Sequence, residues 1–267
     1  MAFCRLPELL EKEISMSGIS IFMYHQVGHF EEMREHRASY CDVDRFRAQM
    51  RYLRLINANV ISMSDAVEML QGRKPLAPRA VVLNFDDGCE NFYEHALPIL
   101  DEYRYPSIVY AVAGLAGKTA GWLAASGHPT PPLMTDARLR EIAEHGVEVG
   151  SHAYTHTRLE GVEASVLQHE ISGSKRHLED VLGRPVTHFC YPYGSHDHAA
   201  LAATEAAGYQ SAVTCQRGAA TGDFDLLALP RKAISYGDNA LGFAWKLHMK
   251  DKPKGAALHR PAPSGSQ

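Results

Sequence analysis

Strand-like and helix-like segments alternate along almost the whole chain, and this alternation limits the possible folds more than any other feature. Short apolar runs rich in β-branched residues predict strands at 19–24, 80–85, 107–112, 147–150, 186–190, 211–214 and 226–234. Amphipathic stretches predict helices at 42–56, 64–70, 91–103, 136–145, 162–182 and 198–207. Repeated strand-then-helix units predict parallel strands joined by right-handed crossovers.

Capping residues mark several of the expected helix ends. Asp42 and Thr135 each precede an amphipathic stretch, and Ser64 is expected to cap the helix at 64–70. Gly183 is expected to end the long helix at 162–182. Local sequence preference and hydrophobic periodicity therefore agree about where these helices lie.

Length and composition fit one large globular domain. The 267 residues are 45% hydrophobic and 22% charged, which excludes a disordered chain, a collagen-like fibre and a coiled coil. The net charge of −4 predicts no nucleic-acid partner. We expect an N-terminal extension at 1–18, a barrel domain at 19–249 and a disordered tail at 250–267. A Gly- and Pro-rich loop is expected at 114–134.

The positions of polar residues favour a closed or nearly closed barrel over a short open sheet. These residues fall at or just beyond the C-terminal ends of predicted strands: His25, Asp86, Asp87, His152, His156, Tyr193 and Arg231. In a barrel of alternating strands and helices those ends converge on one mouth, where active sites are built. We therefore expect residues from the two ends of the chain to be neighbours there.

Two adjacent carboxylates, Asp86 and Asp87, end the apolar strand in the motif NFDDG. Placing two acids side by side is costly unless a cation or hydrogen-bond donors compensate. Gly88 lets the backbone turn sharply, so the two side chains can point in different directions. The alternative is an ordinary Asp-Gly turn with solvated acids.

A pair of histidines, His152 and His156, follows another strand in the motif SHAYTH. A spacing of four is a recurrent chelating pattern for Zn²⁺ and similar metals. Ala153 stands where an HExxH motif has its glutamate, which argues against that class of metalloprotease. Two imidazoles and one carboxylate leave open positions for water and substrate, and a second carboxylate can act as a general base. Two ordinary surface histidines are the alternative in a chain that has 15.

These motifs, followed by FCYPYG at 189–194, resemble those of the polysaccharide deacetylases, the NodB-homology or carbohydrate esterase family 4 enzymes. Their order and spacing both fit, and the resemblance covers roughly 19–234. It implies a distorted (β/α)₇ barrel of the NodB-homology type. It also implies metal-dependent removal of acetyl groups from N-acetylated sugars, with Zn²⁺ as the expected ion.

The resemblance also assigns roles to individual residues. It makes Asp86 the general base, and Asp87, His152 and His156 the metal ligands. The backbone N–H of Tyr193 would stabilise the oxyanion that forms during amide hydrolysis.

Two parts of the family pattern are missing. Positions 188–190 supply no arginine at the head of the third motif, and no late Leu-x-x-His strand provides a general acid. His248 follows a leucine but lies in a segment with a helical pattern, so it is a poor substitute for the missing acid histidine.

A permuted subgroup, which includes the poly-N-acetylglucosamine deacetylases, accounts for both gaps. The segment FMYHQV at 22–27 resembles the opening of that subgroup, in which the acid histidine comes from the first strand. His25 then becomes the proton donor, and a packing or capping histidine is the alternative. Arg231 in LPR matches the position from which the subgroup supplies an arginine. It would pair with Asp86, whereas an ordinary surface ion pair is the alternative.

We therefore expect a metal-dependent deacetylase of an N-acetylated amino sugar, with a lipid-linked or other envelope-glycan precursor as substrate. A deformylase of a lipid-linked amino sugar and a non-catalytic sugar-binding barrel are the alternatives. No secretory signal is visible and the five cysteines are scattered, which favours a cytoplasmic protein, peripheral to the inner face of the membrane. The segment 241–254 combines Leu, Phe and Trp with Lys and is compatible with a weak membrane-surface contact. Its alternative is a last barrel helix with a solvated basic end.

Overall fold

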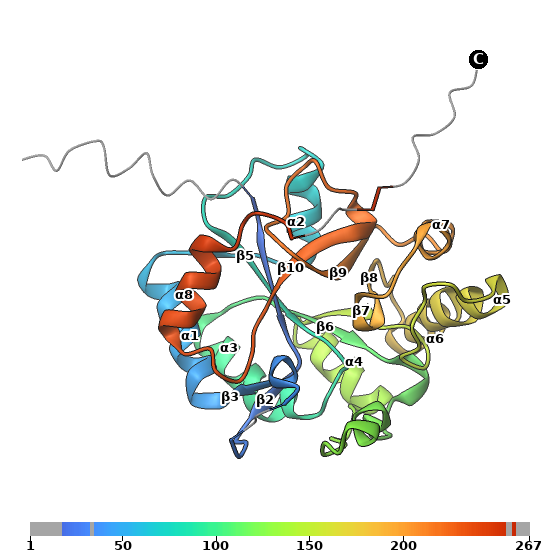
Figure 1. Cartoon of the computed structure of the whole chain (residues 1–267), viewed down its shortest axis with the longest axis horizontal. Coiled ribbons are helices and arrows are strands. Elements are labelled where there is room, and N and C mark those ends of the chain that lie inside the picture. Colours follow the sequence, from blue (N-terminus) through green and yellow to red (C-terminus); the bar gives the residue numbers. More distant parts are fainter. Residues whose placement is uncertain (1–17, 33–34, 255–257, 260–267) are drawn as a thin grey trace, which may run out of the picture.

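Seven parallel strands form a closed barrel in the computed structural model, which describes residues 18–32, 35–254 and 258–259 (Figure 1). Around the barrel the order is β1-β10-β9-β8-β7-β6-β5, and β5 closes the ring by pairing with β1. The strands are β1 (Ser20–Tyr24), β5 (Ala80–Phe85), β6 (Ile108–Ala111), β7 (Glu148–Ser151), β8 (His188–Cys190), β9 (Ser211–Arg217) and β10 (Leu229–Ala233). The expected (β/α)₇ barrel is confirmed.

The barrel is distorted between β5 and β6. Strand β6 pairs with only the end of β5, at Asn84 and Phe85, whereas β1 pairs along its whole opposite edge. The short strand β4 (Asn59–Val60) pairs with the beginning of β5, at Ala80 and Val81. Because β1 occupies one edge of β5, β4 and β6 divide the other edge between them.

Helices cover the outside of the barrel (Figure 1). They are α1 (Val43–Leu55), α2 (Met63–Leu70), α3 (Leu97–Tyr103), α4 (Asp136–Glu144), α5 (Ala164–Leu167), α6 (Ser174–Leu182), α7 (His198–Ala206) and α8 (Ala240–Met249). Short 3-10 turns are η2 (Arg37–Ser39), η4 (Ala113–Leu115), η5 (Gly121–Ser126), η7 (Pro192–Gly194) and η8 (Leu226–Ala228). A separate two-stranded sheet pairs β2 (Gln26–Gly28) with β3 (Tyr40–Asp42) at the barrel mouth.

The expected caps are confirmed for two helices and wrong for a third. Asp42 accepts the first N–H groups of α1, and Thr135 accepts an N–H of α4. Ser62, not Ser64, caps α2, because its hydroxyl accepts the Asp65 N–H at 3.0 Å. The Ser64 hydroxyl instead hydrogen-bonds to a ring nitrogen of His188, on a neighbouring strand.

Two of the predicted helices contain π-helical turns, and for the first of them the sequence already predicts an interruption by Pro98. The stretch at 91–103 divides into η3 (Phe92–Ala96) and α3, and that at 162–182 divides into α5, η6 (Gln168–Gly173) and α6. Pro98 lies in the first turn of α3, where its missing N–H is tolerated. Such turns depend on local backbone registers that hydrophobic periodicity does not encode.

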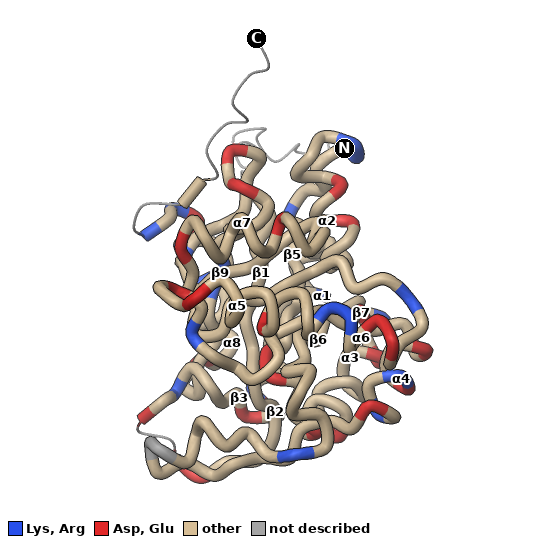
Figure 2. Tube along the Cα trace, turned by 90° about the vertical axis from the view of Figure 1, so that its right-hand side faces the viewer, with Lys and Arg blue, Asp and Glu red and all other residues tan. Residues whose placement is uncertain are grey.

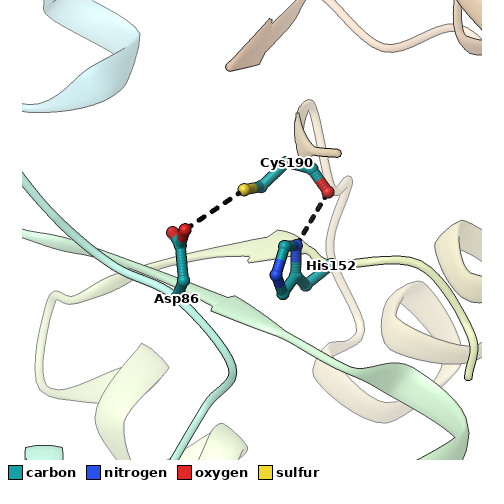
Figure 3. A group of neighbouring side chains, drawn as sticks. All are labelled: Asp86, His152 and Cys190. Atoms are coloured by element: carbon teal, nitrogen blue, oxygen red, sulfur yellow. Dashed lines mark hydrogen bonds between the residues drawn. The ribbon is translucent and has the colours of Figure 1, made fainter. Parts of the chain in front are cut away.

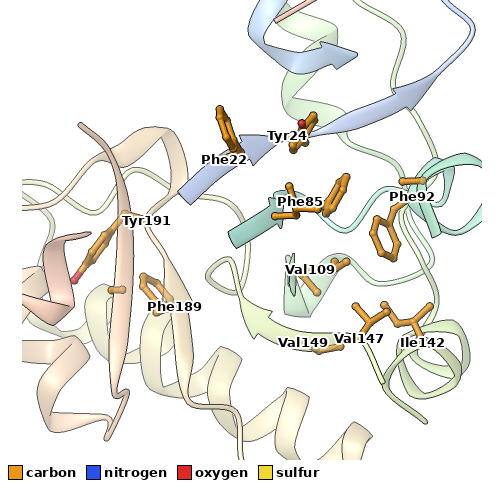
Figure 4. Close-up of a cluster of buried hydrophobic side chains, with 14 of the residues drawn as sticks. Phe22, Tyr24, Phe85, Phe92, Val109, Ile142, Val147, Val149, Phe189 and Tyr191 are labelled. Carbon is orange, nitrogen blue, oxygen red and sulfur yellow. The ribbon is translucent and has the colours of Figure 1, made fainter. Parts of the chain in front are cut away.

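Alternate residues on each strand face two different cores. Phe22, Tyr24 and Phe85 pack outward against the helices, with Tyr24 stacked on Phe85 at 5.2 Å between ring centroids (Figure 4). Ile21 and Val82 belong to a second cluster with the buried side of α2. Since Asp86 continues the parity of Val82, the strand directs its carboxylate to the barrel interior. The fold therefore fixes which of the two acids faces inward.

The expected tail does not leave the barrel directly after α8. The Asp251 carbonyl accepts the Ala219 N–H at 2.9 Å, and the Lys254 N–H donates to the Arg217 carbonyl at 2.9 Å. The chain at 251–254 thus pairs with backbone groups at the end of β9 and just after it, while the disordered tail at 250–267 stays a prediction. Residues 1–17 and most of the remaining tail lie outside the described residues.

Charged residues of both signs are mixed on the surface. Figure 2 shows Lys and Arg interspersed with Asp and Glu over the face that it presents. Among the residues described, no helix is long and apolar enough to span a bilayer.

Candidate metal centre and active site

A cleft of about 610 Å³ lies at the C-terminal ends of the barrel strands. Six of the seven predicted site residues line it: His25, Asp86, Asp87, His152, His156 and Tyr193. Arg231 lies directly behind Asp86, to which it is hydrogen-bonded. The barrel therefore brings together Arg231 from β10 and residues that follow β1, β5, β7 and β8.

Asp87, His152 and His156 form a buried cluster. The Oδ1 atom of Asp87 lies 3.5 Å from Nε2 of His152 and 3.4 Å from Nε2 of His156. Asp87 and His156 have positive φ angles of 74° and 65°, and so has Ala153 between the histidines, at 62°. Non-glycine residues adopt this conformation at some cost, and such residues cluster at functional sites. The backbone is thus turned so that three side chains converge.

The donor set of this cluster fits a divalent cation. Nδ1 of His152 donates to the Cys190 carbonyl at 2.8 Å, which leaves the Nε2 lone pair directed at Asp87. The Oδ1 atom of Asp87 is buried and has no hydrogen-bond partner in the described part of the chain. Burial raises the pKa of Asp87, but its histidine neighbours outweigh burial, and the pKa lies well below its ordinary value. An ionised, unpaired carboxylate beside two imidazole nitrogens is the ligand type of catalytic zinc sites.

Aromatic rings hold the second histidine in place. Trp122, from the Gly- and Pro-rich loop, stacks on His156 at 4.0 Å between ring centroids and 20° between planes. Tyr193 packs against the same imidazole with its ring at 4.6 Å. The inserted loop therefore contributes directly to the cluster, and one face of Trp122 is already used by a histidine.

Asp86 is held by a bidentate ion pair. Arg231 donates from Nη1 to Oδ1 at 2.7 Å and from Nη2 to Oδ2 at 2.8 Å, and its Nε donates to the Thr214 carbonyl at 2.8 Å. Burial raises the pKa of Asp86, but the guanidinium outweighs this effect and the pKa lies below its ordinary value. The carboxylate is thus ionised and fixed in orientation.

Cys190 lies between Asp86 and His152, which belongs to the Asp87 cluster (Figure 3). Its thiol is 3.5 Å from Oδ2 of Asp86, and its carbonyl accepts from His152. Asp86, His152 and Cys190 also lie close enough together to be considered as metal ligands. However, both oxygens of Asp86 already pair with Arg231, and burial raises the pKa of the Cys190 thiol. The Asp87 cluster is therefore the better candidate centre.

His25 and Tyr193 lie at the edges of the cleft. Nε2 of His25 is 3.9 Å from Oδ2 of Asp86, and its side chain is 19% exposed. Tyr193 has a left-handed backbone (φ 58°), and Gly194 follows with φ 66°. A Cβ atom at Gly194 would lie 2.7 Å from the backbone of Cys215, so only glycine fits this turn. Both residues can therefore contact a ligand in the cleft.

Sequence reasoning missed some cleft residues and correctly discounted one histidine. Arg158, whose guanidinium lies 4.3 Å from the Tyr193 ring centroid, lines the cleft together with His36 and Cys215. Only the proximity of Arg158 to His156 in sequence could have indicated its place. His248 hydrogen-bonds to Tyr52 at 2.9 Å and does not line this cleft.

Comparison with known proteins gives the family. Residues 73–212 match the family model described as polysaccharide deacetylase. The chain belongs to this family. It is 28% identical to a putative polysaccharide deacetylase, YxkH, of Bacillus subtilis, over 84% of this chain and 74% of that protein. It is 25% identical to a poly-beta-1,6-N-acetyl-D-glucosamine N-deacetylase of Staphylococcus epidermidis, over 71% of this chain and 66% of that protein.

Solved structures of deacetylases share the fold. The deacetylase PplD of Streptococcus pyogenes, in complex with acetate, superimposes with a TM-score of 0.73 at 24% identity, over 86% of this chain and 98% of that one. IcaB from Ammonifex degensii gives 0.71 at 23% identity, over 86% and 97%. The family membership and the shared barrel place the chain among the carbohydrate deacetylases, which remove acetyl groups from acetylated sugars.

Proposed function

We propose that the protein is a metal-dependent hydrolase that removes the acetyl group from an N-acetylated amino sugar. One observation carries the proposal: Asp87, with an unpartnered buried oxygen, faces two histidine nitrogens at 3.4 and 3.5 Å beside the Arg231-held Asp86. The Asp87 cluster has the composition of a metal site, and the Asp86–Arg231 pair has that of a general base. A sugar-binding protein without activity has no use for both.

Asp87, His152 and His156 would hold the cation. Two imidazoles and one carboxylate favour Zn²⁺ among the common divalent ions and leave coordination positions open. When bound, the cation supplies Lewis acidity toward the acetyl carbonyl and lowers the pKa of a nearby water.

The protein's own groups then move the protons. Asp86 accepts a proton from the attacking water, since its carboxylate is ionised and its orientation is fixed by Arg231. The Tyr193 N–H donates to the oxyanion that develops on the carbonyl oxygen. His25, whose Nε2 atom lies 3.9 Å from Oδ2 of Asp86, protonates the departing amine. Asp86 is thus the proton acceptor when water adds, and His25 is the proton donor when the amine departs.

The substrate we propose is a lipid-linked or other envelope-glycan precursor that carries an N-acetylhexosamine. The relatives named as poly-beta-1,6-N-acetyl-D-glucosamine N-deacetylases support the sugar. The cleft is lined by aromatic and cationic side chains, among them Trp122, Tyr193 and Arg158, which suit a sugar ring attached to a polar or anionic group.

A pair of variants tests the assignment of the two aspartates. Asp86→Asn is expected to lower free-amine release from N-acetylglucosamine conjugates by about 10²- to 10⁴-fold, while the bound metal stays near the wild-type level. Asp87→Asn is the matched control, expected to lose metal and activity together. Amine release is followed with a fluorogenic amine reagent, and metal by elemental analysis after dialysis.

The outcomes separate the possible errors. Unchanged turnover in Asp86→Asn would show that Asp86 is not the general base. Full metal retention in Asp87→Asn would show that Asp87 is not a metal ligand. If the wild-type protein releases amine from N-formyl but not N-acetyl conjugates, the acyl group has been assigned wrongly. If it releases amine from neither, while binding both, the proposed activity fails.

A further inference from the structure

The outward face of α8 is apolar at each of its exposed positions. Leu241, Trp245 and Met249 are 80%, 52% and 66% exposed. They recur at intervals of four, so they form one stripe along the helix. On the neighbouring helix α1 the exposed positions are polar at Asp44, Arg51 and Arg54, and only its last residue, Leu55, is an exposed apolar side chain.

The inner face of α8 already has its packing partners. Phe243 and Leu247 are fully buried, and the Phe243 ring stacks on Phe22 of the barrel at 4.5 Å between centroids. The barrel therefore accounts for the inner stripe but not for the outer one. A helix that is apolar on both faces has a second apolar environment.

Cations gather at the C-terminal end of the stripe. Nζ of Lys250 lies 3.8 Å from the Trp245 ring centroid, and Lys252 and Lys254 are exposed just beyond it. Partial desolvation and the charges of Arg217, Lys246 and Lys254 lower the pKa of Lys250, which places these cations near one another.

The acids in this region are already paired. Asp251 binds the buried ammonium of Lys232, with 2.5 Å between Nζ and Oδ1. Asp238 pairs with Lys246 and also accepts the Ser235 N–H. The charge left over at this end of α8 is therefore positive, and its complement is an anionic surface.

We propose that the outer face of α8 docks on an anionic lipid bilayer. Leu241, Trp245 and Met249 would enter the interface between headgroups and acyl chains, while Lys250, Lys252 and Lys254 contact lipid phosphates. Tryptophan prefers this depth because its ring is apolar and its N–H is polar. Three apolar side chains on a short helix give weak, reversible binding that depends on lysine and on salt.

The lipid surface accounts for both features at once. A bilayer offers an apolar layer directly beneath a layer of phosphates, which matches a stripe with cations at its end. A second copy of the chain would have to supply both an apolar contact surface and unpaired acidic side chains. The inference does not depend on the proposed catalytic activity, because no residue of α8 lines the cleft.

Vesicle co-sedimentation of the whole protein tests this inference. We expect binding to phosphatidylcholine vesicles that contain about one third phosphatidylglycerol, and little binding to phosphatidylcholine alone. Trp245→Ser is expected to reduce the partition coefficient about tenfold. The matched control is Val166→Ser, because Val166 is exposed on α5, on the opposite side of the barrel (Figure 1).

A charge-neutralising pair tests the electrostatic part. Lys250→Gln with Lys254→Gln is expected to lower the partition coefficient by about tenfold or more, since each lysine near an anionic surface contributes roughly fivefold. Arg176→Gln with Arg184→Gln removes the same charge from exposed positions on and just after α6. Wild-type partitioning should fall steeply between 50 and about 300 mM salt.

Two further measurements keep the result interpretable. Far-UV circular dichroism and free-amine release should be unchanged in Trp245→Ser, so lost binding is not lost folding. Equal sedimentation of Trp245→Ser and Val166→Ser overturns the proposal. So does a wild-type dimer in light scattering that Trp245→Ser converts to a monomer without any vesicle binding, which would assign the stripe to a second copy.

Discussion

Arg231 and Cys190 lie side by side next to Asp86, and Arg231 supplies the positive charge there. The third motif lacks its expected arginine, and a small thiol stands at Cys190 within 3.2 Å of the Arg231 Nη2 atom. The guanidinium comes instead from β10, and it reaches Asp86 because Leu229 and Arg231 face the barrel interior with the same parity. At the scale of a residue, the positive charge beside Asp86 thus comes from the last strand of the barrel and not from the third motif.

Replacing this arginine by lysine tests its role in holding Asp86. Arg231→Lys keeps one charge but loses the bidentate geometry, so we expect amine release to fall by about 10²-fold. Because the guanidinium lowers the pKa of Asp86, weakening the pair raises that pKa. The acidic limb of the activity–pH profile should therefore move to higher pH. Activity is measured from pH 4 to about 9 on protein whose thermal unfolding has been checked.

Two outcomes contradict this account. If the acidic limb keeps its position while activity falls, Arg231 acts on something other than the ionisation of Asp86. If both activity and pH profile are unchanged, the ion pair has no catalytic consequence. Arg217→Lys, on the adjoining strand β9, is the matched control.

At the scale of an element, strand ends could be predicted better than helix details. His25, Asp86 and His152 follow apolar runs whose length and composition identify buried strands, so their shared place at the mouth follows from parallel topology. The π turns at 92–96 and 168–173 could not be predicted, because hydrophobic periodicity does not encode a local change of helical register, and tertiary contacts add to what the pattern leaves out. One such contact is buried Glu170, which accepts the backbone N–H groups of Tyr154 and Thr155.

The site could be predicted for the same reason, except for some residues of the cleft. Motif spacing identified the clustered acids and histidines, since each motif is short and local. The sequence leaves open whether Trp122 stacks on a sugar or packs its loop, and it gives Arg158 no role, because a loop's path over the mouth is set by packing rather than by periodicity. The cap of α2 was misplaced by two residues, since Ser62 and Ser64 have equal capping ability.

The cap of α7 links that helix to the loop at Gly161 and gives a prediction about stability. Asp197 accepts the Ala200 N–H at 2.8 Å and the Gly161 N–H at 2.9 Å. We expect Asp197→Ala to lower the free energy of unfolding by about 1–2 kcal/mol at pH 7. Burial raises the pKa of Asp197, but these backbone hydrogen bonds outweigh it and the pKa is lowered.

The sign of the pH effect follows from that lowered pKa. The contribution of Asp197 is present above its unfolded-state pKa and is lost as pH falls through its folded-state pKa. Urea denaturation should therefore separate wild type from Asp197→Ala clearly at pH 7 and much less near pH 3. An equal difference at both pH values would mean that the carboxylate charge contributes nothing. Asp180→Ala, at an exposed position of α6, is the control.

At the scale of the whole molecule, barrel closure is what assembles the candidate centre. Asp87 follows β5, His152 and His156 follow β7, and β6 lies between these strands. A cation bound by all three would therefore connect non-adjacent strands in the folded state only. Binding of such a cation would therefore be coupled to barrel stability, because a ligand that binds only the folded state stabilises it.

Thermal unfolding measures this coupling. After removal of metal with a chelator, addition of Zn²⁺ at about 100 times its dissociation constant should stabilise the fold by about 2.7 kcal/mol. For a domain of this size that corresponds to a rise in Tm of about 5–10 °C. His156→Ala should abolish most of this rise, whereas His145→Ala, an exposed histidine outside the cleft, should retain it. If both variants respond to Zn²⁺ as the wild type does, the ion binds elsewhere. The strand-spanning centre would then be excluded even if the protein hydrolyses acetamides, because the stabilisation reports on where the ion is held and not on turnover.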